Sequence, residues 1–392
     1  MMNFLMLFLC LSTFATELDS LSSKRLIAIG ESGHAVAEFH HQRSAISRRF
    51  IEKHGFRNIF VEEDVLSGFN LADAIDSCRG SYDPVAVRRA FGNFDSTTYR
   101  HNEFYPFYEF LCKWNTDHPH DPVRLYGIDV WSNYWDIRKF LEKKLLPLNI
   151  PQISMHVTQA KDQCFLWSLD NQNDYATHVD WIYYAANNRI DPNRNAKCLS
   201  ALNNLNMQLL VFRNQIPDYN RISLIMDNAE AQQNIRDVYA GNFSMAMNLR
   251  DAFQARALMN LNTKKGSIFL AHNLHVFQKM SFVTDPGWFR VTSSGEWLKI
   301  NYRDTMAVIG MGGFNIQSLR DGQYPEPTSP RSIDLTLHKT GKPTAVVKAS
   351  QFPGVWFVHN ERQVNGLSIT PTEQFDYYFF IDQSGPATLW KF

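Results

Sequence analysis

Five short apolar runs, each four or five residues long, constrain the fold more than any other feature of the chain. Runs of this length, bounded by polar residues or glycine, are typical of strands buried on both faces of a parallel sheet. We expect these strands at Leu26–Ile29, Asn58–Val61, Val123–Tyr126, Ser267–Ala271 and Met306–Gly310. A stretch of helical length, Ala35–His54, joins the first two and ends at Gly55, a favoured helix C-cap. This βαβ pattern predicts an α/β fold with a mostly parallel sheet and flanking helices.

The region between the third and fourth predicted strands has a helical pattern. Its helical stretches are Trp135–Leu146, Val157–Trp167, Leu199–Phe212 and Ile222–Leu261. We therefore expect a mainly helical insertion over residues 133–261, within an α/β domain that spans residues 24–320. A proline-rich loop follows at Pro325, Pro327 and Pro330. After it, strand-like runs predict a β-rich extension, residues 321–392, packed on the same domain: Thr344–Lys348, Gly354–Val358 and Tyr377–Ile381.

Residues 1–16 have the character of a signal peptide. Asn3–Ala15 is apolar and uncharged, and it is shorter than the roughly 20 residues that a membrane span needs. Thr13, Phe14 and Ala15 place small residues at cleavage-like positions, although no Lys or Arg precedes the apolar run. We expect export, to a periplasm or outside the cell, and no stable membrane span. An uncleaved anchor and a misassigned start codon are the alternatives.

Charge and cysteine content narrow the function classes. Lys and Arg together number 39, as do Asp and Glu, so no basic excess points to nucleic acid as a partner. Of the five cysteines, Cys10 lies in the expected signal peptide, and no pair has the Cys-x-x-Cys spacing of a zinc ribbon. Cys164 and Cys198 are a possible disulfide pair in an exported protein, but their spacing is equally compatible with free buried thiols.

Ionisable residues follow four of the predicted strands. Because the carboxyl ends of parallel strands share one edge of a sheet, where ligands bind, we expect the residues after each strand to lie near one another. They are Glu31 and His34, then Glu62, Glu63 and Asp64, then Asp129, and then His272 and His275. Gathering such groups in one place costs desolvation free energy unless they pair or take part in chemistry. This edge is therefore the candidate active site.

The spacing within these groups suggests general acid–base chemistry. A carboxylate beside an imidazole, as in Glu31 and His34, fixes the tautomer and raises the basicity of the histidine. His272 and His275 are suited to stabilising an oxyanion or binding a metal. The alternative interpretation is structural: a helix-start acid with a solvent-facing histidine, and a polar surface loop.

Motifs for other mechanisms are missing from the sequence. It contains no Gly-x-Ser-x-Gly elbow, no Gly-x-Gly-x-x-Gly fingerprint and no P-loop.

Strand alternation would put Glu62 and Glu63 on opposite faces, and at least one of the clustered acids should meet a cation such as Arg43 or a histidine. If the protein is an enzyme, the simplest nucleophile is water activated by His34.

The order of these motifs resembles the erythromycin esterase family. The likeness runs from about Leu26 to Gly313. It is carried by Gly30-Glu31-x-x-His34, Glu38-Phe39, Arg43, a strand ending in Glu62, Tyr126–Asp129, Arg250-Asp251 and Ala271–His275. The resemblance implies hydrolysis of a small-molecule ester by water, with no metal and no cofactor. It leaves the oligomeric state open.

The resemblance also implies roles for individual residues. The family's active-site positions are occupied here by Glu31, His34, Arg43, Glu62, His272 and His275. His34 is then the general base, and Glu31 and Glu62 orient the base and the water. The carbonyl oxygen is bound by Arg43, His272 and His275. Asp129, Arg250 and Asp251 are expected to support the site or to bind substrate.

Helical periodicity does not place Arg43 in this site. Nine residues after His34, it would lie about half a turn out of phase and about 13 Å along an unbroken helix. It can reach Glu31 and His34 only if the helix begins after His34 and the side chain bends back. His40 and His41 are interpreted as polar residues on a helix without a function, and Glu38 stays ambiguous.

The substrate is open. Ala35 stands where the family often has glycine, and residues 133–261 carry no motif of the members that inactivate macrolide antibiotics, so antibiotic resistance is only one possible role. Two other classes of function also remain. One is a metal- or haem-binding protein, or a metal-dependent hydrolase, that uses the same His and Glu residues. The other is a non-catalytic secreted binding protein that has kept the fold.

Overall fold

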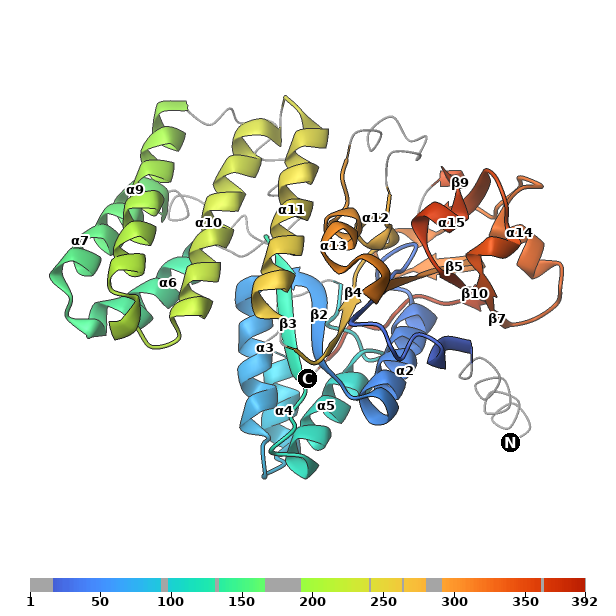
Figure 1. Cartoon of the computed structure of the whole chain (residues 1–392), viewed down its shortest axis with the longest axis horizontal. Coiled ribbons are helices and arrows are strands. Elements are labelled where there is room, and N and C mark those ends of the chain that lie inside the picture. The colour runs from blue at the N-terminus through green and yellow to red at the C-terminus, as the bar shows by residue number, and fades with distance from the viewer. Residues whose placement is uncertain are drawn as a thin grey trace. The chain divides into compact units, whose positions relative to one another are not determined.

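A computed structural model describes residues 17–92, 98–130, 134–165, 192–239, 241–262, 264–279, 291–360 and 363–391 (Figure 1). The chain forms two compact units. The sheet unit comprises Met1–Glu62, Gly68–Tyr126 and Leu258–Phe392, and the helical unit comprises Glu63–Ser67 and Gly127–Ala257. The expected signal peptide, residues 1–16, lies outside the described residues. Within the described residues, no helix combines the length and the apolar character needed to cross a membrane.

The main sheet is mostly parallel, as predicted. Its strand order is β3-β2-β4-β1-β5-β10-β7, and the short β6 pairs with β5. The strands are β1 (Leu26–Ile29), β2 (Phe56–Asp64), β3 (Arg124–Asp129), β4 (Gly266–Leu270), β5 (Met306–Ser318), β6 (Gly322–Gln323), β7 (Thr344–Lys348) and β10 (Tyr377–Ser384). β1 pairs in parallel with β4 and β5, and β2 pairs in parallel with β4, so the carboxyl ends of these strands share one edge.

The C-terminal segment completes the same sheet. β10 pairs in parallel with β5, and β7 pairs with β10 in antiparallel orientation. Residues 321–392, expected as an extension, thus supply three strands to the main sheet: β6, β7 and β10. The run predicted at Gly354–Val358 is strand β8 (Trp356–Asn360), which instead forms a separate two-stranded sheet with β9 (Gln363–Ile369).

Four helices pack in the core cluster on one face of the sheet. They are α2 (Ala37–His54), α3 (Val65–Ser77), α4 (Pro84–Gly92) and α5 (Tyr105–Asp117). Their buried side chains meet alternate strand residues in one apolar cluster that includes Ile27, Ile29, Phe39, Phe50 and Leu111. Strand alternation explains why Ile27 and Ile29 reach this cluster while Ala28 does not. Shorter helices complete the sheet unit: α12 (Asn273–Val276), α13 (Ser294–Tyr302), α14 (Ile333–His338) and α15 (Pro371–Gln374).

Helix α2 ends where the sequence predicts but begins later. Gly55 takes a left-handed φ of 73°, and its N–H donates to the carbonyl of Phe50, which confirms the expected C-cap. The first helical residue is Ala37, not Ala35, and Val36 has extended backbone. The segment between β1 and α2 is therefore free to take a loop conformation.

The helical unit confirms the predicted insertion between the third and fourth strands. Its elements are α6 (Tyr134–Leu145), α7 (Pro151–Ala160), a π-helical turn (Lys161–Phe165), α9 (Pro192–Val211), α10 (Tyr219–Tyr239) and α11 (Phe243–Leu261). The stretch predicted as one element at Ile222–Leu261 is two helices, because Asn242 caps a new one: its Oδ1 accepts from the N–H of Met245 at 3.0 Å. The end of the helix predicted at Val157–Trp167 lies outside the described residues.

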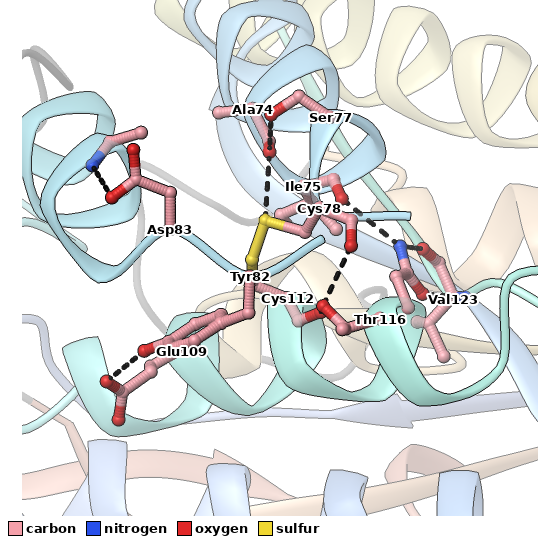
Figure 2. The surroundings of a disulfide bond; sticks show 12 residues. Ala74, Ile75, Ser77, Cys78, Tyr82, Asp83, Glu109, Cys112, Thr116 and Val123 are labelled. Atoms are coloured by element: carbon pink, nitrogen blue, oxygen red, sulfur yellow. Dashed lines mark hydrogen bonds between the residues drawn. A yellow bond between two sulfur atoms is a disulfide. The ribbon is translucent and has the colours of Figure 1, made fainter. Parts of the chain in front are cut away.

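Each unit contains one disulfide. Cys78 and Cys112 join α3 to α5 in the sheet unit, and Cys164 and Cys198 join the π-helical turn to α9 in the helical unit. Figure 2 shows how the first bond is supported by neighbouring polar contacts: Thr116 Oγ1 donates to the carbonyl of Cys78 at 2.7 Å, and Tyr82 Oη donates to Glu109 at 2.6 Å. The pairing of Cys164 with Cys198 resolves the alternatives that spacing left open.

Candidate active site

One asparagine, Asn273, joins the loops after β1 and β4 to strand β5. The backbone N–H of Asn273, after β4, donates to the carbonyl of Glu31, after β1, at 2.7 Å. Its side chain donates to the carbonyl of Met311 in β5 at 2.8 Å and accepts from the N–H of Met311 at 3.2 Å. A Cβ on Gly30 would lie 2.0 Å from Asn273 Oδ1, so this close approach requires glycine.

The loop that carries Glu31 and His34 is not helical. Ala35 has a φ of 57°, in the left-handed region that favours glycine. This is the position at which the resembling family often has glycine. The carbonyl of His34 accepts from Ser318 Oγ at 2.8 Å, and the carbonyl of Ala35 accepts from the N–H of Leu319 at 3.0 Å. These contacts hold the loop on the end of β5.

The buried carboxylate of Glu31 lies between the side chains of His34 and Arg43. His34 Nδ1 lies 2.8 Å from Glu31 Oε1, and Arg43 Nη2 lies 2.7 Å from Glu31 Oε2. The Glu31 side chain is 0% exposed and that of Arg43 is 1% exposed. The helix start at Ala37 removes the phase argument against Arg43. Arg43 lies beside Glu31, where periodicity from His34 did not place it.

Glu62 contacts both histidines of the loop after β4. Its Oε1 lies 3.2 Å from His275 Nε2 and 4.0 Å from His34 Nε2, and its Oε2 accepts from the backbone N–H of His272 at 2.7 Å. The rings of His34 and His272 have centroids 5.3 Å apart. Glu62 thus meets histidine partners, as expected for one of the clustered acids. All six residues expected at the catalytic positions belong to the sheet unit, and the contacts join them into one cluster.

The carboxylates favour protonation of His34. Burial opposes its charged form, but the hydrogen bond to Glu31 and the negative charge of Glu62 outweigh burial and raise the pKa of His34 above its ordinary value of 6.5. The charge of Arg320 acts weakly in the opposite direction. His34 is therefore a stronger base than a free imidazole.

His272 is held neutral. Burial, followed by the charge of His34, lowers the pKa of His272 to about 3. Its Nδ1 accepts from the N–H of Leu274 at 3.2 Å and caps α12. The proton of the neutral ring is therefore on Nε2, which makes that nitrogen a hydrogen-bond donor. Two neighbouring histidines are thus given opposite properties, one as a base and one as a neutral donor.

The remaining candidates belong to the helical unit. Arg250 forms an ion pair with Asp129, with Nε 3.0 Å from Oδ1, and Asp129 accepts the N–H of Val130 at 2.7 Å. Asp251 is fully buried. Asp64 is buried, and its Oδ1 accepts two N–H groups at the start of α3. It is a helix cap.

The sequence interpretation missed two buried histidines. His40, treated as a polar helix residue, is 0% exposed and lies 3.3 Å from Arg43 Nη2, and its Nε2 lies 3.1 Å from Nδ1 of His101. The available signal was spacing, since His40 is three residues before Arg43 and shares its helix face. His41, in contrast, is exposed. Glu38 ties α2 to β10 by accepting from Ser384 Oγ at 2.6 Å.

The ligand types for a metal are present, but their arrangement differs from a metal site. His34, Glu62, His272 and His275 are the residues that could supply ligands. Within the described ranges, no group of three or more His, Cys, Asp or Glu side chains is arranged to hold a metal ion.

A family model described as erythromycin esterase matches residues 51–384 of the chain. The matched span contains Glu62, His272 and His275, together with the Asp129–Arg250 pair. Glu31, His34 and Arg43 precede it, so their place in the site comes from the geometry above.

Three solved structures share the fold. One is a succinoglycan biosynthesis protein, with a TM-score of 0.74 and 14% identity over 96% of this chain and 92% of that one. A Bacillus cereus protein gives a TM-score of 0.73 and 14% identity with the same coverage. A histidine-to-asparagine mutant of the erythromycin esterase EreC, in its open conformation, gives a TM-score of 0.73 and 16% identity over 97% of this chain and 96% of that one.

Proposed function

The chain belongs to the erythromycin esterase family and is an esterase-type hydrolase, and from this premise we propose that it cleaves a small-molecule ester or lactone with water activated by His34. The arrangement of His34 carries the proposal. Its Nδ1 is bonded to buried Glu31, its Nε2 faces Glu62, and its side chain, 10% exposed, is the most accessible of the paired groups. A base held in one tautomer and reachable by solvent is what hydrolysis by water requires.

The first step is attack by water on the carbonyl carbon. Neutral His34 takes a proton on Nε2 while the water oxygen forms the new C–O bond, and the carbonyl oxygen becomes an oxyanion. We assign the nucleophile to a water molecule hydrogen-bonded to both His34 Nε2 and Glu62 Oε1, since these atoms lie 4.0 Å apart, a separation that one water can bridge. Glu31 stabilises the imidazolium that forms, since it faces the opposite ring nitrogen.

The second step is collapse of the tetrahedral intermediate. The oxyanion re-forms the carbonyl, the bond to the leaving alkoxy oxygen breaks, and that oxygen takes the proton from His34. The products are a carboxylic acid and an alcohol, or a hydroxy acid from a lactone, and His34 returns to its neutral state.

His272 is the best-placed group for the oxyanion. Its low pKa keeps the ring neutral, and its Nδ1 contact leaves the proton on Nε2. Removing one donor to an oxyanion typically lowers kcat by about 10²- to 10³-fold. Arg43 is 1% exposed and contacts Glu31, so we assign it to neutralising that carboxylate and not to binding the carbonyl oxygen.

A substrate screen tests the proposal. The purified mature protein is assayed against aryl esters, small lactones and macrolides, because neither the family nor the fold specifies the size of the substrate. Turnover of any ester or lactone above the buffer rate supports hydrolysis. The absence of turnover across the panel from about pH 5 to 9, where a histidine base titrates, favours a non-catalytic binding protein.

Activity should rise with pH across the titration of His34. Because the reaction needs the neutral base and the pKa of His34 is raised above 6.5, kcat/KM is expected to fall on the acid side with a midpoint above pH 6.5. Glu62→Gln removes a negative charge that raises this pKa, and should move the midpoint to lower pH. A wild-type midpoint at or below 6.5 would contradict this assignment.

We also propose that no metal takes part. The lack of a suitable ligand group among the described residues supports this proposal. Dialysis of the purified enzyme against EDTA should leave kcat within about twofold of the untreated value, a change of about 0.4 kcal/mol or less in the barrier. A loss of turnover that a divalent cation restores would instead assign His34, Glu62, His272 or His275 as ligands.

Export is proposed on two observations. The first is the apolar segment at residues 1–16, and the second is the presence of two disulfides, which persist in oxidising compartments. N-terminal sequencing of protein recovered outside the cytoplasm should begin near Glu17. Recovery of intact residues 1–16 on a cytoplasmic protein would refute export.

A further inference from the structure

The buried charge behind His34 continues beyond Glu31. Arg43 contacts Glu31 on one side and His40 on the other, and His40 contacts His101. His40 and His101 are both 0% exposed, and neither takes part in the hydrolysis proposed above. Two buried imidazoles beside a buried guanidinium therefore need an explanation.

Donor and acceptor chemistry determines where the protons lie in the hydrogen bonds that link Arg43, His40 and His101. A guanidinium can only donate, so His40 Nδ1 must accept from Arg43 Nη2 over 3.3 Å. The proton of His40 is then on Nε2, which donates to His101 Nδ1 over 3.1 Å. Both histidines must be neutral for these two hydrogen bonds to form. Burial, reinforced by the charge of Arg43, keeps the pKa of His40 well below 6.5, and burial also lowers the pKa of His101.

The guanidinium of Arg43 depends on few contacts. Nη2 alone meets both Glu31 Oε2, at 2.7 Å, and His40 Nδ1, at 3.3 Å. Nε and Nη1 are buried and have no hydrogen-bond partner among the described residues. The Tyr99 ring lies 5.5 Å from the guanidinium carbon. Tyr99 is itself fixed, because its Oη donates to the carbonyl of Leu270 at 2.9 Å.

We infer that His40, supported by His101, is a positioning residue that holds the Arg43 cation against Glu31 and thereby limits how strongly Glu31 acts on His34. Glu31 faces both Arg43 and His34, so a cation held close to it offsets part of its negative charge. The other charged or titratable groups acting on His34 are Glu62, His272 and Arg320. Without the acceptor at His40, Arg43 is less well fixed, and more of the Glu31 charge acts on His34.

The test compares His40→Leu, His40→Asn and His41→Leu. Leucine removes the acceptor while keeping an apolar volume, asparagine keeps an oxygen near the position of Nδ1, and His41 is an exposed histidine on the same helix. The pKa of His34 is measured by NMR titration of isotope-labelled histidine, with its resonance assigned by its absence in His34→Ala. This readout needs no substrate.

In His40→Leu, the pKa of His34 is expected to rise by about half a unit, equivalent to about 0.7 kcal/mol. His40→Asn should restore it, and His41→Leu should leave it unchanged. With a substrate in hand, the acid limb of kcat/KM should move up by the same amount. His101→Leu, one residue further from Arg43, should give a smaller shift in the same direction and serves if His40→Leu does not fold.

A shift smaller than about 0.2 unit, equivalent to about 0.3 kcal/mol, or a shift downward, overturns the inference, as does failure of asparagine to restore the value. The kinetic part rests on the proposed function, but the NMR part does not. A shift of the His34 pKa without ester hydrolysis refutes the proposed function and keeps the inference about His40. Ester hydrolysis without that shift supports the proposed function and overturns the inference.

Discussion

His34→Ala is expected to lower kcat by about 10³-fold, which corresponds to about 4 kcal/mol in the activation barrier. The variant removes the group that accepts the proton of the attacking water, whereas Glu31 keeps its ion pair with Arg43. KM should change little, since His34 acts on water and not on the substrate's binding groups. Steady-state kinetics on the best substrate of the screen measures both parameters.

His41→Ala is the matched control for this variant, because it removes an exposed histidine from the adjacent helix. Both variants should unfold at temperatures close to that of the wild type. If His34→Ala retains kcat within about tenfold of wild type, equivalent to about 1.4 kcal/mol, His34 is not the general base.

Arg43→Met is expected to reduce the free energy of unfolding by about 3–5 kcal/mol at neutral pH. Glu31 is 0% exposed, and loss of Arg43 leaves its carboxylate buried without its cation. Methionine keeps an unbranched chain of similar length, so the loss reflects charge more than volume. Urea unfolding followed by circular dichroism measures the change, with the slope against urea compared between variants.

The Glu31→Gln change provides the test of cause. If the cost of Arg43→Met comes from an uncompensated buried charge, the double variant with Glu31→Gln should recover most of the lost stability. Additive losses in the double variant would instead assign the effect of Arg43 to packing against Tyr99. A loss below about 1 kcal/mol in Arg43→Met alone would place the pair among weak surface-like ion pairs.

The central strands of the sheet were predictable because their signal is local. Leu26–Ile29 and Met306–Gly310 are apolar on both faces, and such runs indicate buried parallel strands whatever their neighbours are. The neighbours themselves were not predictable. β10 pairs with β5 although β6, α14, β7, the β8–β9 hairpin and α15 lie between them in the sequence, and β8 forms a separate sheet with β9. Pairing between distant strands depends on packing that short windows do not contain.

The candidate site shows the same division. Glu31, His34, His272 and His275 follow strand ends. Glu62 lies within β2, near its carboxyl end, and the geometry of a parallel sheet is enough to bring all five together. Arg43 needed the resemblance, because the left-handed Ala35 breaks the helical phase that periodicity assumes. His40 was missed because the buried residues of α2 are partly polar and include Arg43, Ser44 and Ser47. Hydrophobic periodicity cannot identify such a face.

If the chain is exported, as proposed, its two disulfides have a consequence for the order in which it is oxidised. Both bonds join cysteines that are consecutive in the mature sequence, and each spans 34 residues within one unit. During N-to-C passage through a membrane, Cys78 meets Cys112 before Cys164 emerges, and Cys164 then meets Cys198. The earliest available partner is always the native one. On this order of emergence we expect oxidation to need an electron acceptor but no reshuffling by an isomerase.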